Sequence, residues 1–510
     1  MTFPRVTAAD WRAQVEKELA GASFEKTLVF KTAEGLSIAP LYTEAKHAHV
    51  IGAGAPFRIV MRSTSSDDLD NGAEGLWLDA SALPQVQARD AFFVIDGALP
   101  PGARSDLRFA LIGAPELAKS IAERYPNGLA AMVSTLDDHA AGADAADELA
   151  VALSTGASYL EMMLAAGLSP NAAAKQLAVQ IPVGRDTFAE LCKVRALRVC
   201  LQKLLGVAKA DSTRTLIHAV CSTRTLTQRD PWVNMLRCTT QVFSAVLGGA
   251  DLVTPLAFDR AFGTPSALAH RIARNTGLVL RDESSLGRVA DPAGGSYYLE
   301  TFTDELAREA WKRFQALEKE GGVAAARSSG RLQARFDASW KARLELISKR
   351  REAVVGVSEF ANLDEKLPGL PHVVSDLGRR DSESFELIRV KGAQPLSSSG
   401  ERETVLVTLG PLAESRARVG FATGFFAAGG IRAREATQAE QADLACLCGT
   451  DERYAAEAVA RVKALKAAGC KRVFLAGRPG ALEQPLKDAG IDGFIFMGCD
   501  VVATLNEVLS

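Results

Sequence analysis

Residues Arg214–Ala257 read RTLIHAVCSTRTLTQRDPWVNMLRCTTQVFSAVLGGADLVTPLA, and they hold one repeat of a pattern that runs through most of the chain. Two short apolar runs, RTLIHAV and DLVTPLA, predict β-strands. The stretch between them has the composition and length of a helix. A strand, a helix and a second strand in this order predict a parallel pair joined by a crossover helix.

The helix in this repeat, PWVNMLRCTTQVFSAVLGG, has clear start signals. Asp230 is suited to the N-cap and Pro231 to the first turn, where its missing N–H costs nothing. Trp232, Met235 and Leu236 have the spacing of a buried helix face. We therefore expect a helix from Pro231 onward that packs these three side chains into the core.

The same alternation extends from about Asp106 to Arg351. Strands are predicted at LRFALIG and AAMVST, and helices at APELAKSIAERY and DAADELAVALSTGASYLEMMLAAG, the second closed by Gly167. Alternation over this length favours a parallel sheet, and at this size a (β/α)8 TIM barrel is the leading α/β architecture. The pattern alone does not distinguish the barrel from an open doubly wound sheet.

The chain divides into four predicted segments. Residues 1–45 form an N-terminal arm with a hairpin and a short helix, for which Asp10 is the expected N-cap. Residues 46–361 form the barrel domain, and residues 362–402, rich in Pro, Ser and Gly, form a linker. Residues 403–510 carry five short apolar runs between helical patterns, which predicts a flavodoxin-like doubly wound domain.

The composition is that of an ordinary globular protein. Of 510 residues, 47% are hydrophobic and 24% are charged, and the formal net charge is -2. This balance gives no electrostatic pull towards nucleic acid or anionic lipid, and no apolar run approaches the roughly 20 residues of a membrane span. The N-terminus lacks a signal-peptide core, and the eight cysteines are scattered. We therefore expect a cytoplasmic protein without nucleic-acid or membrane partners.

Two local patterns resemble binding sites but are better explained as loops. Gly52-x-Gly54 begins like a dinucleotide-binding loop, but Phe57 stands at the third glycine position, so we interpret a turn. His47 and His49 alternate as two metal ligands can, but no nearby cysteine or carboxylate set completes a site. We therefore expect no metal.

Cys446 and Cys448 flank Leu447 on a predicted buried strand, and we expect them to point to opposite faces as small core residues. The sequence contains no Gly-x-Ser-x-Gly elbow, Walker loop or His-Glu-x-x-His pair. Those motifs mark the commonest hydrolase, nucleotide and zinc chemistries. The residues by themselves thus indicate a two-domain α/β protein and do not name a reaction.

Four longer stretches carry a resemblance to a known family. They read GLSIAPLYT (Gly35–Thr43), LTQRDPWVNMLR (Leu226–Arg237), VLGGADLVTPLAFDRAFGTP (Val246–Pro265) and RIARNTGLVLRDESSLGRVADPAGGSYYLE (Arg271–Glu300). Together they resemble the methylmalonyl-CoA mutase family over almost the whole chain. Within that family, the short arm and the start of the last domain are similar to the small subunit of heterodimeric mutases.

This resemblance implies which parts an active member needs. Adenosylcobalamin supplies a radical by cobalt–carbon homolysis, and the cofactor carries that chemistry. A flavodoxin-like domain holds the cobalamin through the His of an Asp-x-His-x-x-Gly loop, and a barrel threads the CoA thioester along its axis. Tyr and His side chains near the barrel mouth position the substrate and shield the radical.

The cobalt-ligand loop of the family falls on the start of the last domain. By this resemblance its Asp, His and Gly positions appear as Pro411, Ala413 and Arg416. The Ser-x-Leu that supports the nucleotide tail of the cofactor is replaced around Leu447–Gly449. A later Gly-Gly pair has become Gly477–Gly480, which reads GRPG. Because all these features are lost together, we expect no cofactor-binding residues and a degenerate cobalamin-binding fold.

The catalytic positions of the barrel are also altered. The Tyr and His of the family's Ser-x-Tyr-His motif appear as Leu136 and Asp137, so we expect no catalytic residue. His139 lies two residues on, and we do not assign it the lost role. An Arg-x-Ser pair that contacts CoA in active members appears as Gln176 and Ala178.

His218 alone survives of a His-x-Gln substrate pair, because Val220 stands at the Gln position. We keep His218 as a remnant substrate-binding residue. A buried histidine whose hydrogen bonds are satisfied inside the barrel is the stronger interpretation.

The sequence thus predicts the small, non-catalytic subunit of a heterodimeric methylmalonyl-CoA mutase, an isomerase. The partner large subunit is expected to bind adenosylcobalamin and to interconvert methylmalonyl-CoA and succinyl-CoA, while this chain binds no cofactor. One alternative is a CoA-binding or regulatory module without mutase activity. Another is a mutase of a different acyl-CoA that uses a separate cobalamin-binding chain.

Overall fold

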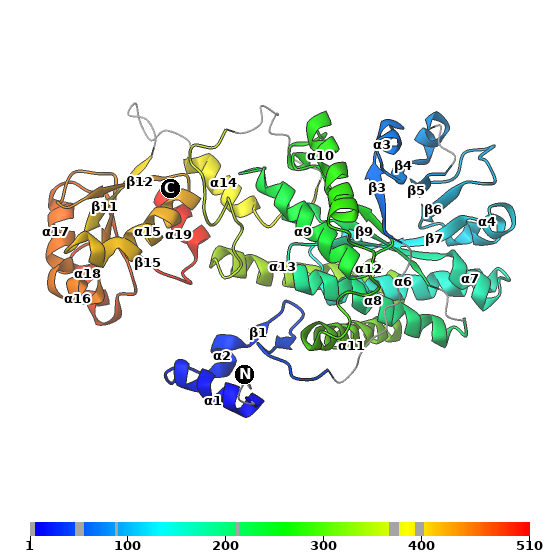
Figure 1. The fold of residues 1–510 in the computed structure, drawn as a ribbon. Coiled ribbons are helices and arrows are strands. Elements are labelled where there is room, and N and C mark those ends of the chain that lie inside the picture. The colour runs from blue at the N-terminus through cyan, green and yellow to red at the C-terminus, as the bar shows by residue number, and fades with distance from the viewer. Residues whose placement is uncertain (1–5, 46–55, 87–89, 211–213, 367–376, 393–401) are drawn as a thin grey trace, which may run out of the picture. The chain divides into compact units, whose positions relative to one another are not determined.

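The computed structural model of the chain describes residues 6–45, 56–86, 90–210, 214–366, 377–392 and 402–510 (Figure 1). The chain forms two compact units. The first consists of Met1–Arg224, Met235–Ala257 and Pro265–Trp340, and the second of Thr225–Asn234, Phe258–Thr264 and Lys341–Ser510. Two short loops, one after β9 (Leu216–Cys221) and one after β10 (Leu252–Thr254) of the barrel, therefore belong to the second unit. From Lys341 onward the whole chain belongs to it.

Among the described residues of the first unit, eight parallel strands close into a barrel. The strands are β3 (Arg58–Arg62), β4 (Gly75–Asp79), β5 (Phe92–Asp96), β6 (Arg108–Ile112), β7 (Gly128–Ser134), β8 (Leu177–Val183), β9 (Leu216–Cys221) and β10 (Leu252–Thr254). They follow one another in chain order, and β10 closes the barrel by pairing with β3. The predicted α/β barrel is confirmed, and the open sheet is excluded for this region.

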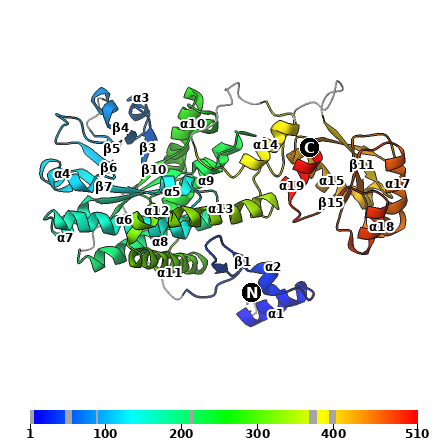
Figure 2. The ribbon, with the colours of Figure 1, turned by 180° about the vertical axis from the view of Figure 1, so that it is seen from behind.

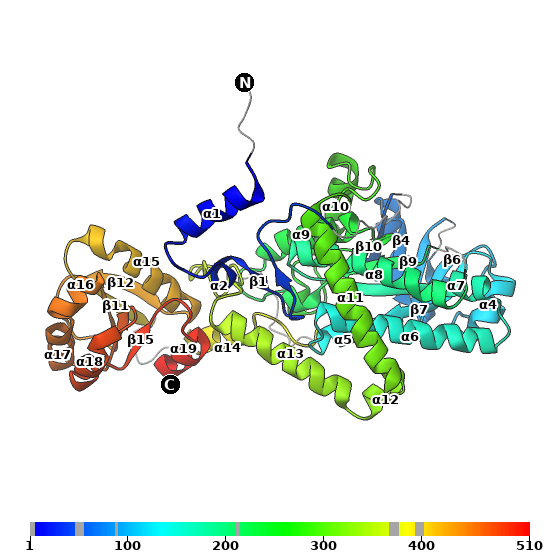
Figure 3. The same cartoon turned by 90° about the horizontal axis from the view of Figure 1, so that it is seen from below.

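Long helices accompany the later strands of the barrel. These are α6 (Ala145–Ala165), α8 (Thr187–Val207), α9 (Val233–Leu247), α10 (Ala267–Leu278) and α11 (Tyr297–Lys319). Helix α11 lies against both α6 and α8 (Figure 3). The other helices of this part are α3 (Asp67–Asp70), α4 (Ala118–Arg124), α5 (Leu136–Ala140), α7 (Pro170–Gln176), α12 (Gly322–Ser328) and α13 (Arg331–Ser348). Gly167, with φ of 89°, follows α6 and ends it as predicted.

Helix α9 begins later than the sequence predicts. It starts at Val233, so Asp230 and Pro231 precede it and Asp230 is not its N-cap. Asp230 has a φ of 45°, in the left-handed region, whereas an N-cap residue has extended geometry. The backbone N–H of Val233 donates to the Asp230 carbonyl, which makes this segment a turn that leads into the helix.

The buried face of α9 also differs from the predicted one. Trp232 is 45% exposed and Leu236 is 66% exposed, so the prediction that both lie in the core is wrong. Asn234 is buried instead, and its side-chain amide donates to the carbonyls of Thr227 and Phe258. A polar side chain that satisfies loop carbonyls therefore takes the inward position.

The N-terminal arm contains α1 (Ala8–Glu18), α2 (Phe24–Leu28), β1 (Phe30–Lys31) and β2 (Ser37–Ile38). The two strands pair antiparallel, which confirms the predicted hairpin. Thr7, and not Asp10, is the N-cap of α1. Asp10 stands at the third helical position and accepts from the Thr7 backbone N–H, which completes a capping box.

The second unit is built on a sheet of five parallel strands in its described part, in the order β12-β11-β13-β14-β15. The strands are β11 (Glu403–Thr408), β12 (Arg432–Ala436), β13 (Leu444–Cys448), β14 (Arg472–Ala476) and β15 (Gly493–Ile495). Helices α15 (Leu412–Ala428) and α19 (Val501–Leu509) cover one face, and α17 (Val459–Ala467) and α18 (Glu483–Asp488) cover the other (Figure 2). Apolar residues that alternate along β11, β13 and β14 fill both layers.

Cys446 and Cys448 lie in the same apolar layer, and Leu447 lies in the opposite one. Their expected placement on opposite faces is wrong, because side chains two residues apart on a strand share a face. Both are buried core residues, as predicted. A further helix, α14 (Glu383–Gly392), lies within the predicted linker and buries Phe385 and Ile388.

Candidate functional site

The axis of the barrel is filled by side chains from its own strands. This lumen cluster consists of Val60, Trp77, Phe92, Val94, Ala110, Met132, Ala178, Val220 and Leu252. Each member is at most 6% exposed. The alternate positions of the same strands pack outward against the helices, so the lumen cluster occupies the inward positions. The lumen is therefore a packed core along which no thioester chain can pass without displacing large apolar groups.

Polar residues of the lumen form one chain of hydrogen bonds across neighbouring strands. Ser134 donates to the Gln180 amide oxygen (2.8 Å), and the Gln180 amide nitrogen lies 3.1 Å from Nδ1 of His218. Nε2 of His218 lies 2.7 Å from Oγ1 of Thr254, which itself donates to the Val60 carbonyl (2.8 Å). Since Thr254 uses its own proton there, it accepts from His218.

These partners define the protonation state of His218. The ring carries its proton on Nε2 and accepts at Nδ1 from Gln180, so it is neutral. Burial lowers the pKa of His218 to about 3. The edge of the ring also packs against Trp77, with the ring centres 5.9 Å apart. His218 thus has its hydrogen bonds satisfied within the barrel, and its substrate contact stays a prediction.

Of the two predicted remnants of a CoA contact, one lies in the lumen and one does not. Ala178 belongs to the lumen cluster. Gln176 ends α7, where its side chain accepts from the Ala130 N–H (3.0 Å) and donates to the Gly128 carbonyl (3.2 Å). Both bonds hold the end of α7 against β7, so the structure gives Gln176 a scaffold role.

Leu136 and Asp137 begin α5, directly after β7, at the carboxyl end of the barrel where TIM-barrel enzymes hold catalytic groups. Leu136 packs against the lumen cluster. Asp137 is exposed. The positions that the resemblance assigns to the catalytic Tyr and His are thus occupied by an apolar side chain turned to the core and a carboxylate in solvent.

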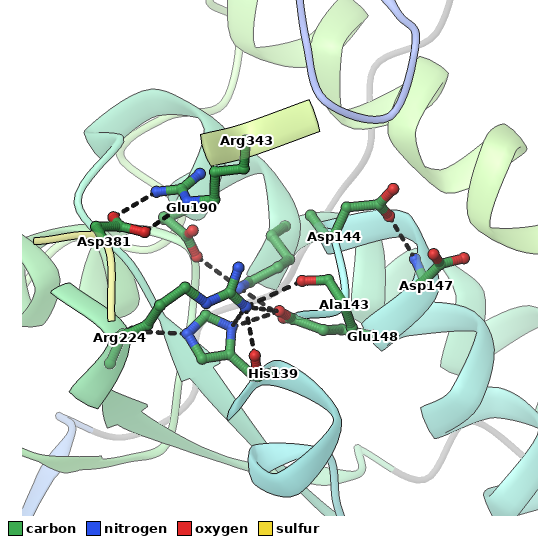
Figure 4. Close-up of polar contacts among 12 residues, drawn as sticks. His139, Ala143, Asp144, Asp147, Glu148, Glu190, Arg224, Arg343 and Asp381 are labelled. Atoms are coloured by element: carbon green, nitrogen blue, oxygen red, sulfur yellow. Dashed lines mark hydrogen bonds and ion pairs between the residues drawn. The ribbon is translucent and has the colours of Figure 1, made fainter. Parts of the chain in front are cut away.

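A buried polar cluster at the same end of the barrel was not predicted (Figure 4). His139 on α5 contacts Glu148 on α6 through Nδ1 (2.6 Å) and Ser222, after β9, through Nε2 (2.6 Å). Lys193 on α8 pairs with Glu148 at 2.8 Å. The Arg224 guanidinium donates to the carbonyls of His139 (2.8 Å) and Ala143 (3.0 Å).

The contacts Ser222–His139–Glu148 have the arrangement of a hydrolase catalytic triad, but the environment of these residues differs from that of a triad. Ser222 is 1% exposed, so its hydroxyl is not presented to a substrate. Arg224 and Lys193 both lie against Glu148, at 3.6 and 2.8 Å, so the carboxylate neutralises two buried cations besides contacting the imidazole. The cluster therefore joins α5, α6, α8 and β9 into one rigid corner. Its members come from segments far apart, so no local motif could have indicated it.

Pro411, Ala413 and Arg416, the positions that the resemblance assigns to a cobalt-ligand loop, follow the carboxyl end of β11. Pro411 caps α15, and Ala413 and Arg416 are exposed in its first turns. Pro411 brings no side-chain capping bond. None of these three side chains is a metal ligand of the kind that cobalt, zinc or iron prefers.

The carboxyl edge of the second sheet is occupied by Tyr454 and Arg418. The buried Tyr454 hydroxyl accepts from the Gly449 N–H (2.9 Å) and lies 2.8 Å from the Ala476 carbonyl. Arg418 donates to the same carbonyl (2.5 Å), and a Cβ added at Gly477 would collide with its guanidinium. The ends of β13 and β14 are thus covered by the chain itself. The residues present do not fit cobalamin.

No group of three or more His, Cys, Asp and Glu residues that could hold a metal ion occurs within the described ranges. Across the same residues, no helix combines the length and the apolar character needed to cross a lipid bilayer. His47, His49, Gly52 and Gly54 lie outside the described residues, so their interpretation stays a prediction.

Comparison with known proteins places this chain in one family. Residues 114–402 match the family model described as methylmalonyl-CoA mutase, which covers more than half of the chain. The chain belongs to this family, and the resemblance seen in the sequence is confirmed.

Its relatives differ in their names and in how much of this chain they match. The methylmalonyl-CoA mutase small subunit of Streptomyces virginiae is 36% identical over 99% of this chain and 97% of its own length. The probable small subunit of Mycobacterium tuberculosis is 37% identical over 85% of this chain and 75% of its own length. A protein of Cereibacter sphaeroides named methylmalonyl-CoA mutase is 34% identical, but over only 43% of this chain and 32% of its own length.

Proposed function

We propose that this chain is the small, non-catalytic subunit of a heterodimeric, adenosylcobalamin-dependent methylmalonyl-CoA mutase. The large subunit binds the cofactor and interconverts methylmalonyl-CoA and succinyl-CoA, and the chain alone turns over no substrate. The relative that matches nearly end to end and the one that matches 85% of this chain are both named as small subunits, which supports this assignment. The activity belongs to the complex, an isomerase.

The filled lumen carries the non-catalytic part of the proposal. Trp77 and Phe92 stand on the barrel axis, and His218 is occupied by Gln180 and Thr254. A mutase must admit its thioester and hold the reacting carbon beside the cofactor, and proximity of this kind needs an open path. The same packing weighs against both alternatives, because a CoA-binding module and a mutase with a borrowed cofactor each need a barrel that opens.

The second unit supports a degenerate cobalamin-binding domain. Its strand order, in which the second strand lies outside the first and the third to fifth follow on the other side, is the order of flavodoxin-like sheets. Such sheets bind ligands at the carboxyl ends of the strands, which here carry Tyr454 and Arg418 in contact with the backbone. We infer that the fold was retained while the cofactor site was lost, and that the cobalamin of the complex is held by the partner alone.

A domain that keeps its fold but lacks a ligand site can still contribute an interface to an assembly. A partner that binds only the folded form stabilises it by mass action, and obligate interfaces are large and apolar. The small subunit would then persist because it completes the heterodimer. All eight cysteines are free thiols, in keeping with the cytoplasmic location that the sequence predicts.

Co-purification tests the proposal. The tagged chain is expressed with a large mutase subunit from the same source, and stoichiometry, cobalamin content and mutase turnover are measured against the chain alone. We expect a one-to-one complex with one cobalamin and activity only when both chains are present. Turnover by the isolated chain with adenosylcobalamin contradicts the non-catalytic role, and failure to form a complex contradicts the heterodimer.

A titration of the isolated chain with acyl-CoA separates the remaining alternative. The filled lumen predicts no saturable binding. Tight binding, together with the absence of a complex, would instead support the CoA-binding module.

A further inference from the structure

Two buried thiols of the first unit face each other between β9 and α9. Cys221 is the last residue of β9, Cys238 lies on α9, and their Sγ atoms are 3.7 Å apart. Cys221 is 5% exposed and Cys238 is 3% exposed. The sulfurs contact each other across a strand and the helix that follows it, so the pair is held by the barrel scaffold.

Other buried cysteines of this unit have a different environment. Cys192 and Cys200 on α8 each lie near a carbonyl oxygen of α11, at 3.6 Å from that of Leu299 and 3.5 Å from that of Ala307. These contacts pair each of the two thiols with a backbone oxygen, whereas Cys221 and Cys238 contact each other through their sulfurs. The contact between Cys221 and Cys238 is therefore not a general consequence of burying cysteines in this core.

The two thiols of the pair are chemically unequal. Burial raises the pKa of Cys221 well above its usual range. The hydrogen bond from Cys221 lowers the pKa of Cys238. One sulfur thus stabilises the thiolate of the other, and the thiolate is the nucleophile in thiol oxidation.

We propose that Cys221 and Cys238 form a modification site at which a peroxide produces a reversible intrachain disulfide. The Cys238 thiolate attacks one peroxide oxygen, the O–O bond breaks, and Cys238 becomes a sulfenic acid as hydroxide leaves. The Cys221 sulfur then attacks the Cys238 sulfur, the S–O bond breaks, and the Cys221 proton leaves with the hydroxyl group as water. Both thiols are oxidised, and hydrogen peroxide is reduced to two water molecules.

The geometry demands only a local change. The sulfurs must approach from 3.7 Å to the roughly 2.0 Å of a disulfide. The new bond closes a ring over residues 222–237, and that ring contains Thr225–Asn234, which belong to the second unit. Oxidation would therefore fix the loop through which the chain first enters the second unit.

Thiol counting on the full wild-type chain tests the site. The reduced protein is treated with hydrogen peroxide at a few equivalents, denatured in N-ethylmaleimide, and analysed by intact mass and peptide mapping. We expect six labelled cysteines instead of the eight of the reduced protein, and one cross-linked peptide pair joining Cys221 to Cys238. Dithiothreitol should restore all eight. Full labelling after peroxide, or loss confined to other cysteines such as Cys499, overturns the proposal.

Two variants sharpen the chemistry. In Cys221→Ser the sulfenic acid at Cys238 cannot resolve, so dimedone should trap it several-fold faster than it traps Cys221 in Cys238→Ser. Cys192→Ser is the matched control, because that thiol is equally buried without a sulfur partner, and it should leave the disulfide yield unchanged. Circular dichroism checks that each variant is folded. The thiol count on the wild-type protein tests the disulfide even if a variant does not fold. Equal trapping at Cys192 and Cys238 would contradict the assigned roles.

Discussion

The barrel lumen and the carboxyl edge of the second sheet are both filled by side chains of this chain, but in different ways. In the lumen, the filling groups stand on the strands themselves, as with Trp77, and are part of the barrel core. At the sheet edge, Tyr454 and Arg418 reach the ends of the strands from the flanking helices. The barrel axis is therefore closed by its own structural core, while the sheet edge is covered by two side chains that can be removed singly.

The largest effect is expected in the lumen. Trp77→Ala removes a buried indole and its hydrogen bond to Asp96 (2.9 Å), and it should lower the free energy of unfolding by about 3–5 kcal/mol. Hydrogen exchange of peptides from the barrel strands measures the loss within the first unit. Trp232→Ala, at a half-exposed site, is the control and should cost far less. Equal losses for the two variants would mean that the lumen is not a packed core.

His218 tests the polar part of the lumen. His218→Leu leaves the Gln180 amide unpaired and should cost about 2–3 kcal/mol at pH 7. The pKa of His218 falls from 6.5 in the unfolded chain to about 3 in the fold, so its contribution is present above pH 6.5 and is lost as the pH falls towards 3.

The pH dependence follows from this sign. Between pH 7 and pH 5 the wild type should lose about 2 kcal/mol relative to His218→Leu, since only the unfolded wild type takes up the proton. Urea unfolding of both proteins at the two pH values measures the change, and the other histidines cancel in the difference. A stability difference between wild type and variant that does not change with pH would show that the fold does not lower the pKa of His218.

At the sheet edge, Tyr454→Phe should have a smaller effect, about 1–2 kcal/mol, because it leaves the Gly449 N–H without its acceptor while keeping the ring. Hydrogen exchange should become faster only in peptides of the second unit, because the loss of stability is local. Tyr297→Phe, at an exposed tyrosine, is the control. If amide hydrogens at the ends of β13 and β14 exchange as slowly in Tyr454→Phe as in the wild type, the hydroxyl does not stabilise this edge.

Arg418→Ala should have the smallest effect, below about 1 kcal/mol, because its side chain is 31% exposed and solvent screens its pairing with Asp451. Arg416→Ala removes an exposed arginine of the same helix and should change nothing measurable. Thermal melting of both variants gives the comparison. Neither variant, nor Tyr454→Phe, should gain cobalamin binding, because none of these substitutions introduces a metal-ligating side chain.

The sequence predicted the later half of the barrel better than the first. From β6 onward, several long helices separate the strands, and their alternation is a local signal that one stretch of sequence carries. Between β3 and β5 only short elements intervene, such as α3, so no such alternation marks these strands. Trp77 and Phe92, which stand on the barrel axis, come from this unmarked part.

The candidate sites show the same limit. The replaced positions Leu136, Asp137 and Ala413 could be read from the resemblance because each is a local motif. The partners of His139 could not, because Glu148 and Ser222 come from other elements and only the closed barrel brings them together. The buried face of α9 was missed for a related reason, since the Asn234 side chain is turned inward by the carbonyls of Thr227 and, from the next loop, Phe258.

Because two loops of the barrel sequence belong to the second unit, no single truncation point separates the two units. The loops after β9 and β10 supply Thr225–Asn234 and Phe258–Thr264 to a unit whose sheet is synthesised much later. There, the Gln228 N–H donates to Glu386 (2.6 Å) and the Asp230 N–H to Glu365 (2.6 Å). During synthesis, the backbone N–H groups of Gln228 and Asp230 therefore lack their acceptors until more than a hundred further residues have been made. A chain truncated at Trp340 lacks these acceptors permanently.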